Sequence, residues 1–344
     1  MARLAPRVLI AGLVVAVAAC SDPSTAPIAS PDRSLSPSTA SLDAGLNPDI
    51  IPDRHILPPH GPKSDPSDAL YTGRVTKGTI YNHGGPVLRT ATNVVAVYWG
   101  SSTIYPGGPA AGTTGTKGQD GSLIGFFLRT LGGSPYFNIN TSYTDASGAH
   151  IQNVVNYNGF WANNTNVPAS GASVSDAQML SMLQSGFNSG KIAYDPNTLY
   201  IIFSANGVNL GGGFGTQYCA YHTHGNVNLT NGGTKTVLYS AMPYNAGNGS
   251  CIAQTTGPNG DPADPEVSVV AHETEETTTD MMANAWFDNR GYENADKCAW
   301  TWGTTQTLAN GAAYNLTLTE NGVSKNFLVQ RNWIAPNGGC AMSY

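Results

Sequence analysis

The stretch of sequence that decides the fold is DPEVSVVAHETEETTTDMMANAWFDNRGYENADKC, residues 264–298. Its apolar run, 267–271, leads directly into an H-E-x-x-E motif that begins at His272, on a segment that we predict to be helical. Successive helical residues are about 100° apart, so His272 and Glu276 lie about 40° apart and both can face one metal ion, with Glu273 within reach of a water. The motif predicts a metallopeptidase site with a carboxylate in place of the usual second histidine, and with Glu273 as the catalytic base.

The third metal ligand has two candidates. Glu293 begins a Glu-Asn-Ala-Asp run that resembles the downstream glutamate ligand and following aspartate of thermolysin-like enzymes, although Asp296 follows it by three residues where the usual spacing is four. In this assignment Asp280 and Asp296 do not bind the metal but accept hydrogen bonds that fix the orientation of a ligand histidine and raise its basicity. Alternatively Asp280 is itself the ligand, because positions 272, 276 and 280 drift by only about 40° per step on a helix. We favour Glu293, because a ligand from outside the helix closes a three-sided site more easily.

The ligand set constrains the chemistry of the site. Two carboxylates and one histidine leave a divalent ion without net charge, so a bound water is less acidified than beside two histidines. Zinc is the expected ion, and a harder ion is the alternative. H-E-x-x-E also occurs by chance on solvated helix faces. The apolar run before the motif and the scarcity of acids, 22 in 344 residues, favour a metal site.

Composition and the first residues indicate export. Charged residues make up only 11% of the chain and the formal net charge is −6, which excludes the basic surface of a nucleic-acid-binding protein. Residues 1–19 have the charged start and short apolar run of a secretory signal, too short for a membrane span. The sequence 17–20, VAAC, also fits a lipobox, in which Cys20 would carry a lipid and provide the protein's contact with a membrane. An ordinary signal cleaved nearby is the alternative.

Residues 20–78 are expected to form a disordered tether. Ten of the 22 prolines lie between residues 21 and 67, and apolar periodicity is absent there. His55 and His60 fall in this stretch, and we expect both to be solvated. The remaining cysteines of an exported chain predict two disulfides, for which we favour Cys219–Cys251 and Cys298–Cys340.

The rest of the chain predicts an α+β fold. Strands are expected at 93–100, 153–161, 199–203 and 236–242, and helices at 121–133 and 175–187. A mixed sheet whose last strand precedes a metal-binding helix is the layout of zincin-type peptidases. We therefore predict a zincin-like domain over 79–280. A small subdomain over 281–344 would contain an Asn-Gly hairpin and be closed by the second disulfide, with the active cleft between the two.

The segment 219–224, CAYHTH, carries histidines two residues apart. On a strand, His222 and His224 would share a face and could bind a metal or stabilise an oxyanion. We expect a loop beside the disulfide instead.

Five short motifs are spread over residues 80–344: GGPVL (84–88), VVAVYWG (94–100), YCAYH (218–222), PNGD (258–261) and NGGC (337–340). Together they resemble the EXORDIUM or phosphate-induced protein family, and the H-E-x-x-E motif resembles its bacterial members. Plant members are extracellular cell-wall proteins linked to growth control, without an established chemistry. The resemblance therefore implies export and a shared fold more than it implies catalysis.

Two classes of function follow. The first is a secreted or lipid-anchored metal-dependent hydrolase, most plausibly a monomeric metallopeptidase that acts on a peptide or cell-envelope substrate. The second is a non-catalytic extracellular protein that associates with the cell wall or with carbohydrate. Sixteen tyrosines and six tryptophans would suit sugar stacking. Metal analysis of the purified protein separates the two.

Overall fold

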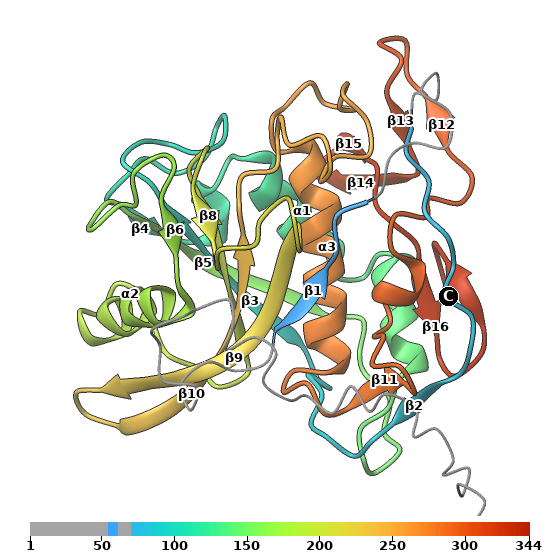
Figure 1. The fold of residues 1–344 in the computed structure, drawn as a ribbon, viewed down its shortest axis with the longest axis horizontal. Helices are drawn as coiled ribbons and strands as arrows, with labels where there is room; N and C mark the ends of the chain where they lie inside the picture. The colour runs from blue at the N-terminus through green and yellow to red at the C-terminus, as the bar shows by residue number, and fades with distance from the viewer. Residues whose placement is uncertain (1–53, 61–69) are drawn as a thin grey trace, which may run out of the picture.

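The centre of the fold is a seven-stranded mixed sheet in the order β1-β9-β10-β7-β3-β5-β4 (Figure 1). The computed structural model describes residues 54–60 and 70–344. Strands β10, β7, β3 and β5 are parallel, while β1, β9 and β4 are antiparallel to their neighbours. The strands are β1 (His55–Leu57), β3 (Thr92–Trp99), β4 (Thr114–Gly115), β5 (Val155–Asn163), β7 (Thr198–Ser204), β9 (Ala220–Leu229) and β10 (Gly233–Met242).

The central strands form because their side chains are apolar on both faces. Alternate residues of β7 belong to two different apolar clusters: Leu199, Ile201 and Phe203 to one, and Tyr200 and Ile202 to the other. Successive side chains of a strand point to opposite faces, so each cluster lies on one side of the sheet. The predicted strands at 93–100, 153–161, 199–203 and 236–242 are confirmed as β3, β5, β7 and part of β10.

Three α-helices cover the two faces of the sheet. They are α1 (Leu123–Leu131), α2 (Asp176–Asn188) and α3 (Asp264–Thr279). Helices α1 and α3 pack in the cluster on one face and α2 in the cluster on the other. Ser175 caps α2 through a capping box with Gln178, as its position before the apolar repeat predicts. The mixed α+β class is therefore confirmed. Among the described residues no helix is both long enough and apolar enough to span a bilayer.

The C-terminal part consists of short hairpins beside α3. Strands β14 (Leu316–Glu320) and β15 (Val323–Phe327) pair through the predicted Asn-Gly turn, in which Asn321 and Gly322 both have positive φ, 51° and 80°. The other short elements are β2 (Ile80–Asn82) with β11 (Trp286–Asp288), β12 (Gln306–Thr307) with β13 (Ala313–Tyr314), β16 (Asn332–Ile334) with β17 (Gly339–Ala341), β6 (Ser173–Val174) with β8 (Asn209–Leu210), and the 3₁₀ turns η2 (Lys117–Gln119), η3 (Phe137–Ser142) and η4 (Asp296–Cys298). The apolar cluster around α3 continues into β14 and β15, so this part shares its core with the sheet.

Both predicted disulfides are confirmed. Cys219 is bonded to Cys251 and Cys298 to Cys340, across sequence separations of 32 and 42 residues. Closing loops of this length stabilises a fold by about 4 kcal/mol each on chain-entropy arguments.

Two expectations about local structure were wrong. Residues 54–60 and 70–78 are not a disordered tether. Strand β1 pairs with β9, and His55 and Leu57 are buried. In 70–78, the backbone N–H groups of Tyr71, Gly73 and Thr76 donate to backbone oxygens of the folded part. Residues 220–224 are not a loop but the start of the ten-residue strand β9. The predicted signal sequence 1–19, the lipobox at Cys20 and the tether residues 21–53 and 61–69 lie outside the described part of the chain.

Glu266, in the first turn of α3, is a buried carboxyl group whose protonation couples stability to pH. The Asn245 backbone N–H donates to Glu266 Oε2 at 3.0 Å, and burial raises the pKa of Glu266 from 4.5 to about 8. Between these two values the folded protein keeps a proton that the unfolded chain has lost. Stability should therefore fall as pH rises through this range.

We expect Glu266→Gln to remove that pH dependence, because glutamine keeps the acceptor oxygen and cannot ionise. Relative to the parent, the variant should gain roughly 3–5 kcal/mol in free energy of unfolding between pH 4.5 and pH 8. Denaturant unfolding at pH 4.5, 6, 7 and 8 measures the difference. Parallel curves for the two proteins would show that Glu266 is ionised in the fold.

Candidate metal site

Helix α3 places the H-E-x-x-E motif in the interior. Every residue of α3 except Pro265 is buried, because the helix is packed between the sheet, α1 and η3. A buried carboxylate is costly unless a cation or hydrogen-bond donors compensate its charge. Glu273, Glu275 and Glu276 must therefore find their partners inside the protein.

The first group of partners contains the predicted helical pair and Asp296. His272 Nε2 lies 3.1 Å from Glu276 Oε1 and 3.7 Å from Asp296 Oδ1. These three residues each offer a ligand atom, and all three atoms lie within 4.8 Å of one another. His272 and Glu276 therefore face each other, as their helical spacing predicts. The second carboxylate in this group is that of Asp296 and not that of Glu293.

Gln330 fixes the ring of His272. Its Nε2 lies 2.8 Å from His272 Nδ1 and donates to the backbone oxygen of Ala295 at 3.0 Å. In this amide orientation a neutral His272 ring accepts at Nδ1 and carries its proton on Nε2, facing Glu276, whereas a protonated ring donates at Nδ1 and needs the Gln330 side-chain oxygen there. A cation on Nε2 requires the proton on Nδ1, where the Gln330 side-chain oxygen would accept it once the amide has turned. Either way Gln330 sets the direction of the imidazole.

The second group brings Glu273 together with His222 of β9. His222 Nδ1 lies 3.1 Å from Glu273 Oε2 and 3.5 Å from Glu276 Oε2. Glu276 therefore belongs to both groups, with one oxygen towards His272 and the other towards His222. The remaining glutamate of the motif, Glu275, faces η3 instead, where Asn140 donates to its carboxylate.

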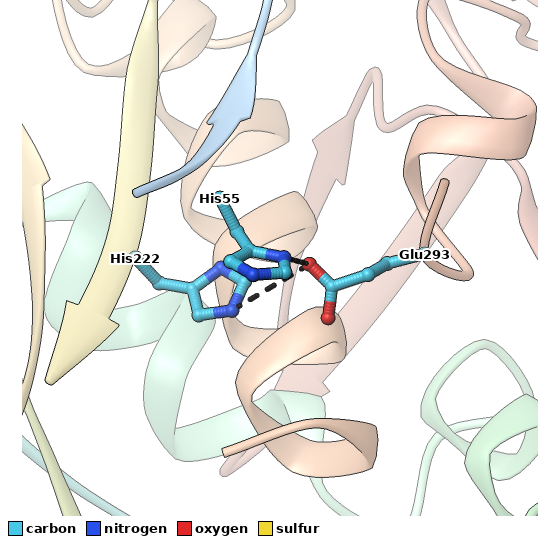
Figure 2. Close-up of side chains that lie close together, drawn as sticks. All are labelled: His55, His222 and Glu293. Carbon is cyan, nitrogen blue, oxygen red and sulfur yellow. Dashed lines mark hydrogen bonds and ion pairs between the residues drawn. The ribbon is translucent and has the colours of Figure 1, made fainter. Parts of the chain in front are cut away.

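The third group joins three distant parts of the chain (Figure 2). His55 comes from β1, His222 from β9 and Glu293 from the loop before η4, and the two imidazoles converge on one glutamate. His55 Nδ1 contacts Glu293 Oε2, and His222 Nε2 lies 3.7 Å from the same oxygen. Glu293 is thus a buried site residue, but its contacts are with His55 and His222 and not with His272.

The three groups form one continuous chain of alternating acid and base: Asp296, His272, Glu276, His222, Glu293 and His55. Burial lowers the pKa of His222, but Glu293, Glu273 and Glu276 outweigh it and raise the pKa to about 10. His272 responds in the same way to burial and to Glu276, and its pKa rises to about 10. Protons on the imidazoles therefore balance part of the carboxylate charge, and a divalent cation can replace them.

The donor set fits a divalent metal ion. Several buried nitrogen and oxygen atoms have no hydrogen-bond partner among the described residues and border this chain: Nε2 of His55, His222 and His272, Oε1 of Glu273 and Glu293, and Oε2 of Glu276. Imidazole nitrogen together with carboxylate oxygen is a ligand combination that zinc accepts. Asp280 lies at the end of α3, where its Oδ1 accepts from the backbone N–H of Ala285 at 2.6 Å and so holds the following loop.

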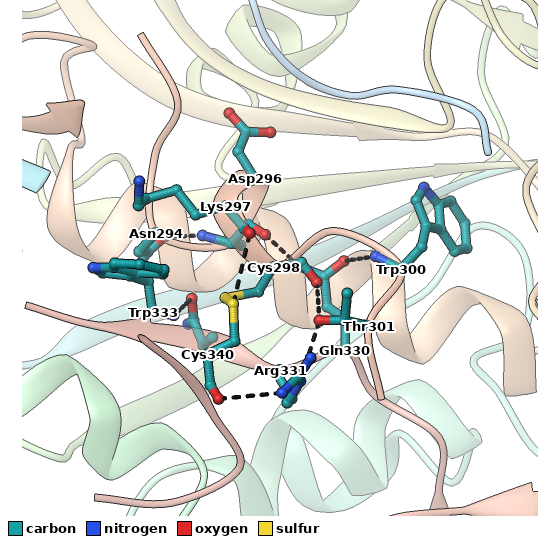
Figure 3. The surroundings of a disulfide bond; sticks show 12 residues. Asn294, Asp296, Lys297, Cys298, Trp300, Thr301, Gln330, Arg331, Trp333 and Cys340 are labelled. Atoms are coloured by element: carbon teal, nitrogen blue, oxygen red, sulfur yellow. Dashed lines mark hydrogen bonds between the residues drawn. A yellow bond between two sulfur atoms is a disulfide. The ribbon is translucent and has the colours of Figure 1, made fainter. Parts of the chain in front are cut away.

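The loop that carries Glu293 and Asp296 is held by the second disulfide (Figure 3). Cys298 is bonded to Cys340, and the Asp296 side chain points away from this bond. Next to it, Lys297 is buried, with Nζ 3.1 Å from Asp288 Oδ2 and 4.3 Å from the centre of the Trp333 ring. The chain directly after Asp296 is thus fixed by the disulfide of Cys298 and by the contacts of the Lys297 side chain.

His55 was missed from the sequence, and His222 was considered as a possible metal ligand but expected to lie in a loop. His55 is followed by two apolar residues inside a proline-rich stretch, and that island was a signal for a strand. Tyr221 and Thr223, residue types that favour strands, alternate with the two histidines, and this was the corresponding signal for β9.

Comparison with known proteins identifies the family. The region described as phosphate-induced protein 1 conserved region matches residues 132–342. No curated protein and no solved structure matches the chain. The matched region covers more than half of the sequence and includes β9, α3 and the loop before η4. The chain therefore belongs to the phosphate-induced protein 1 family, the EXORDIUM-like proteins that its motifs resemble.

Proposed function

We propose that this protein is a metal-dependent hydrolase, and specifically a metallopeptidase with a zincin-like arrangement of sheet and helix. The observation that carries the proposal is the buried chain of three imidazoles and three carboxylates around Glu276, whose possible ligand atoms lie in groups within 4.8 Å of one another. A network built only for stability gains little from such a concentration of buried charge, because apolar residues of similar size would stabilise the core as well.

We assign the metal to His272, Glu276 and Asp296. These three residues would hold a divalent ion, which would supply Lewis acidity towards a scissile carbonyl and a water molecule. Glu273 accepts the proton of the attacking water and returns it to the leaving amine. His222 lies 3.1 Å from the Glu273 carboxylate and holds it in position for both transfers.

The third ligand is tested by two single substitutions. Asp296 is in the group with His272, whereas Glu293 contacts His55 and His222. We expect Asp296→Asn to abolish tight zinc binding and Glu293→Gln to weaken it by at most roughly 100-fold, because the Glu293 side chain contacts His55 and His222 and none of the three assigned ligands. Calorimetric titration with zinc measures both affinities. The reverse order would return the ligand role to Glu293.

Metal content of the purified protein tests the proposal as a whole. Elemental analysis should give about one equivalent of a divalent metal, with zinc expected, and the loaded protein should cleave members of an unbiased peptide library. Protein that binds no divalent metal at micromolar concentration would favour a non-catalytic protein of the cell wall instead. The same proposal includes export, a monomeric state and a peptide or cell-envelope substrate.

A further inference from the structure

Residues 54–60, here termed the N-terminal segment, lie across the candidate site as a strand at the edge of the sheet. In Figure 1, β1 lies between β9 and α3. His55 is paired with His222, and Leu57 with Ala220, in an antiparallel register, and the Cys219 N–H donates to the Leu57 oxygen at 2.8 Å. Without this segment, β9 would be an edge strand with free backbone groups directly beside the metal site.

The side chains of the segment alternate between two environments. His55 points into the site and contacts Glu293, and Leu57 packs in the apolar cluster on the α3 side of the sheet. Ile56 packs in the cluster on the α2 side. An extended peptide added to a sheet edge shows this pattern, in which backbone hydrogen bonds give affinity and alternate side chains enter pockets.

Both ends of the segment are held, the upstream end through the Arg54 side chain and the downstream end through a backbone oxygen. Upstream, Arg54 donates to Asp176 and to the backbone oxygen of Gly211. Downstream, Trp300 Nε1 donates to the backbone oxygen of Pro58 at 2.9 Å. Beyond that contact lies a cavity of about 110 Å³ lined by Trp300 and Ser268, which is one helical turn before the motif. The segment therefore runs from the metal site to Trp300, which also lines this cavity.

We propose that the β9 edge is the binding groove for an extended polypeptide substrate and that the N-terminal segment occupies this groove as a substitute for it. The backbone N–H and C=O groups of β9 match a polypeptide backbone, whereas a sugar chain lacks that alternation. Hydrolysis of the bound peptide rests on the proposed function, whereas binding of the peptide does not require catalysis. While the segment stays in place, His55 contacts Glu293 in the site and the segment competes with a substrate.

Covalent connection keeps the groove filled. A segment tethered to the same chain competes at an effective concentration of about millimolar. Cutting the chain between the segment and the remainder removes this advantage. We therefore expect free peptides to bind in the groove much more tightly after a cut within residues 61–69.

The experiment uses the full chain with the recognition sequence of a site-specific protease placed within 61–69. After cleavage the protein is dialysed and titrated with fluorescent RHILPPH, the sequence of residues 54–60. Fluorescence anisotropy should show saturable uptake of about one peptide per chain, at least 100-fold tighter than in the uncut protein. Unlabelled RHILPPH should compete, and the reversed peptide HPPLIHR should compete at least 10-fold less well.

A matched control carries the same recognition sequence at Asn321-Gly322, in the turn of the β14–β15 hairpin. This cut breaks the chain without releasing the segment, so it should leave peptide uptake at the level of the uncut protein. Near-ultraviolet circular dichroism reports whether each cut protein keeps its tertiary structure.

Two results would overturn the proposal. A folded cut protein that takes up no peptide in 24 h, or a cut protein that unfolds when the segment leaves, would make β1 a permanent part of the sheet. The titration is performed in the presence of a chelator and repeated with zinc. Peptide uptake without any metal binding would refute the proposed function but support the peptide groove. Metal binding without peptide uptake would refute the groove but not the metal site.

Discussion

Glu276→Gln should lose its metal completely. Glu276 is the residue that supplies one oxygen to the group of His272 and Asp296 and its other oxygen to His222. Glutamine removes the negative charge and places an NH₂ group against one of these partners. Zinc affinity should fall by well over the roughly 100-fold that the loss of an outer partner costs. Elemental analysis of purified protein and calorimetric titration with zinc measure the loss.

Glu275→Gln is the control for this experiment. The residue is adjacent in sequence and equally buried, but its carboxylate accepts from Asn140, away from the other groups. It should therefore keep its metal. Equal retention of zinc by both variants would contradict the assignment of Glu276 as a metal ligand.

Glu273→Gln should keep the metal and lose hydrolysis. Its carboxylate is the base in the proposed mechanism, and positioned general acid–base catalysis contributes about 10²–10⁴-fold to a rate. Turnover of a peptide library by zinc-loaded protein, both intact and cut within 61–69, should fall by that factor, and zinc content should stay at one equivalent. Unchanged turnover in the loaded variant would contradict the role given to Glu273.

Glu273→Asp separates chemistry from packing. Aspartate keeps the charge but shortens the side chain, so it should retain more activity than glutamine while leaving a similar gap in the core. If the aspartate variant is as inactive as the glutamine variant and also less stable, then position 273 acts mainly through structure.

The parts of the fold that were predicted from the sequence depend on local pattern. The apolar runs of β3 and β7, the cap at Ser175 and the Asn-Gly turn each have a signature within a few residues. The cysteine pairs are not local, since 32 and 42 residues separate their members, but each lies within one of the two predicted parts of the chain. The facing positions of His272 and Glu276 follow from helix geometry alone.

The rest of the site depends on contacts between distant residues. His55 and Glu293 are 238 residues apart, and nothing local to either position specifies their meeting. The pairing of β1 with β9 creates that contact, and such long-range pairing has no signature within one segment. For the same reason the position of Asp296 beside His272 was not predicted, because the path of the loop after Glu293 decides which carboxylate faces the helix.

The Cys298–Cys340 bond has a consequence for where the protein can work. The loop that carries Glu293 and Asp296 is held by this bond, so an agent that reduces it would release both acids from α3 and lower metal affinity. Cytosolic thiol pools keep cysteines reduced. A newly made chain would therefore remain inert inside the producing cell and would assemble its site only in an oxidising environment. Under the proposed function, two conditions would then prevent premature hydrolysis. The disulfide must first form by oxidation, and the N-terminal segment must then leave the groove.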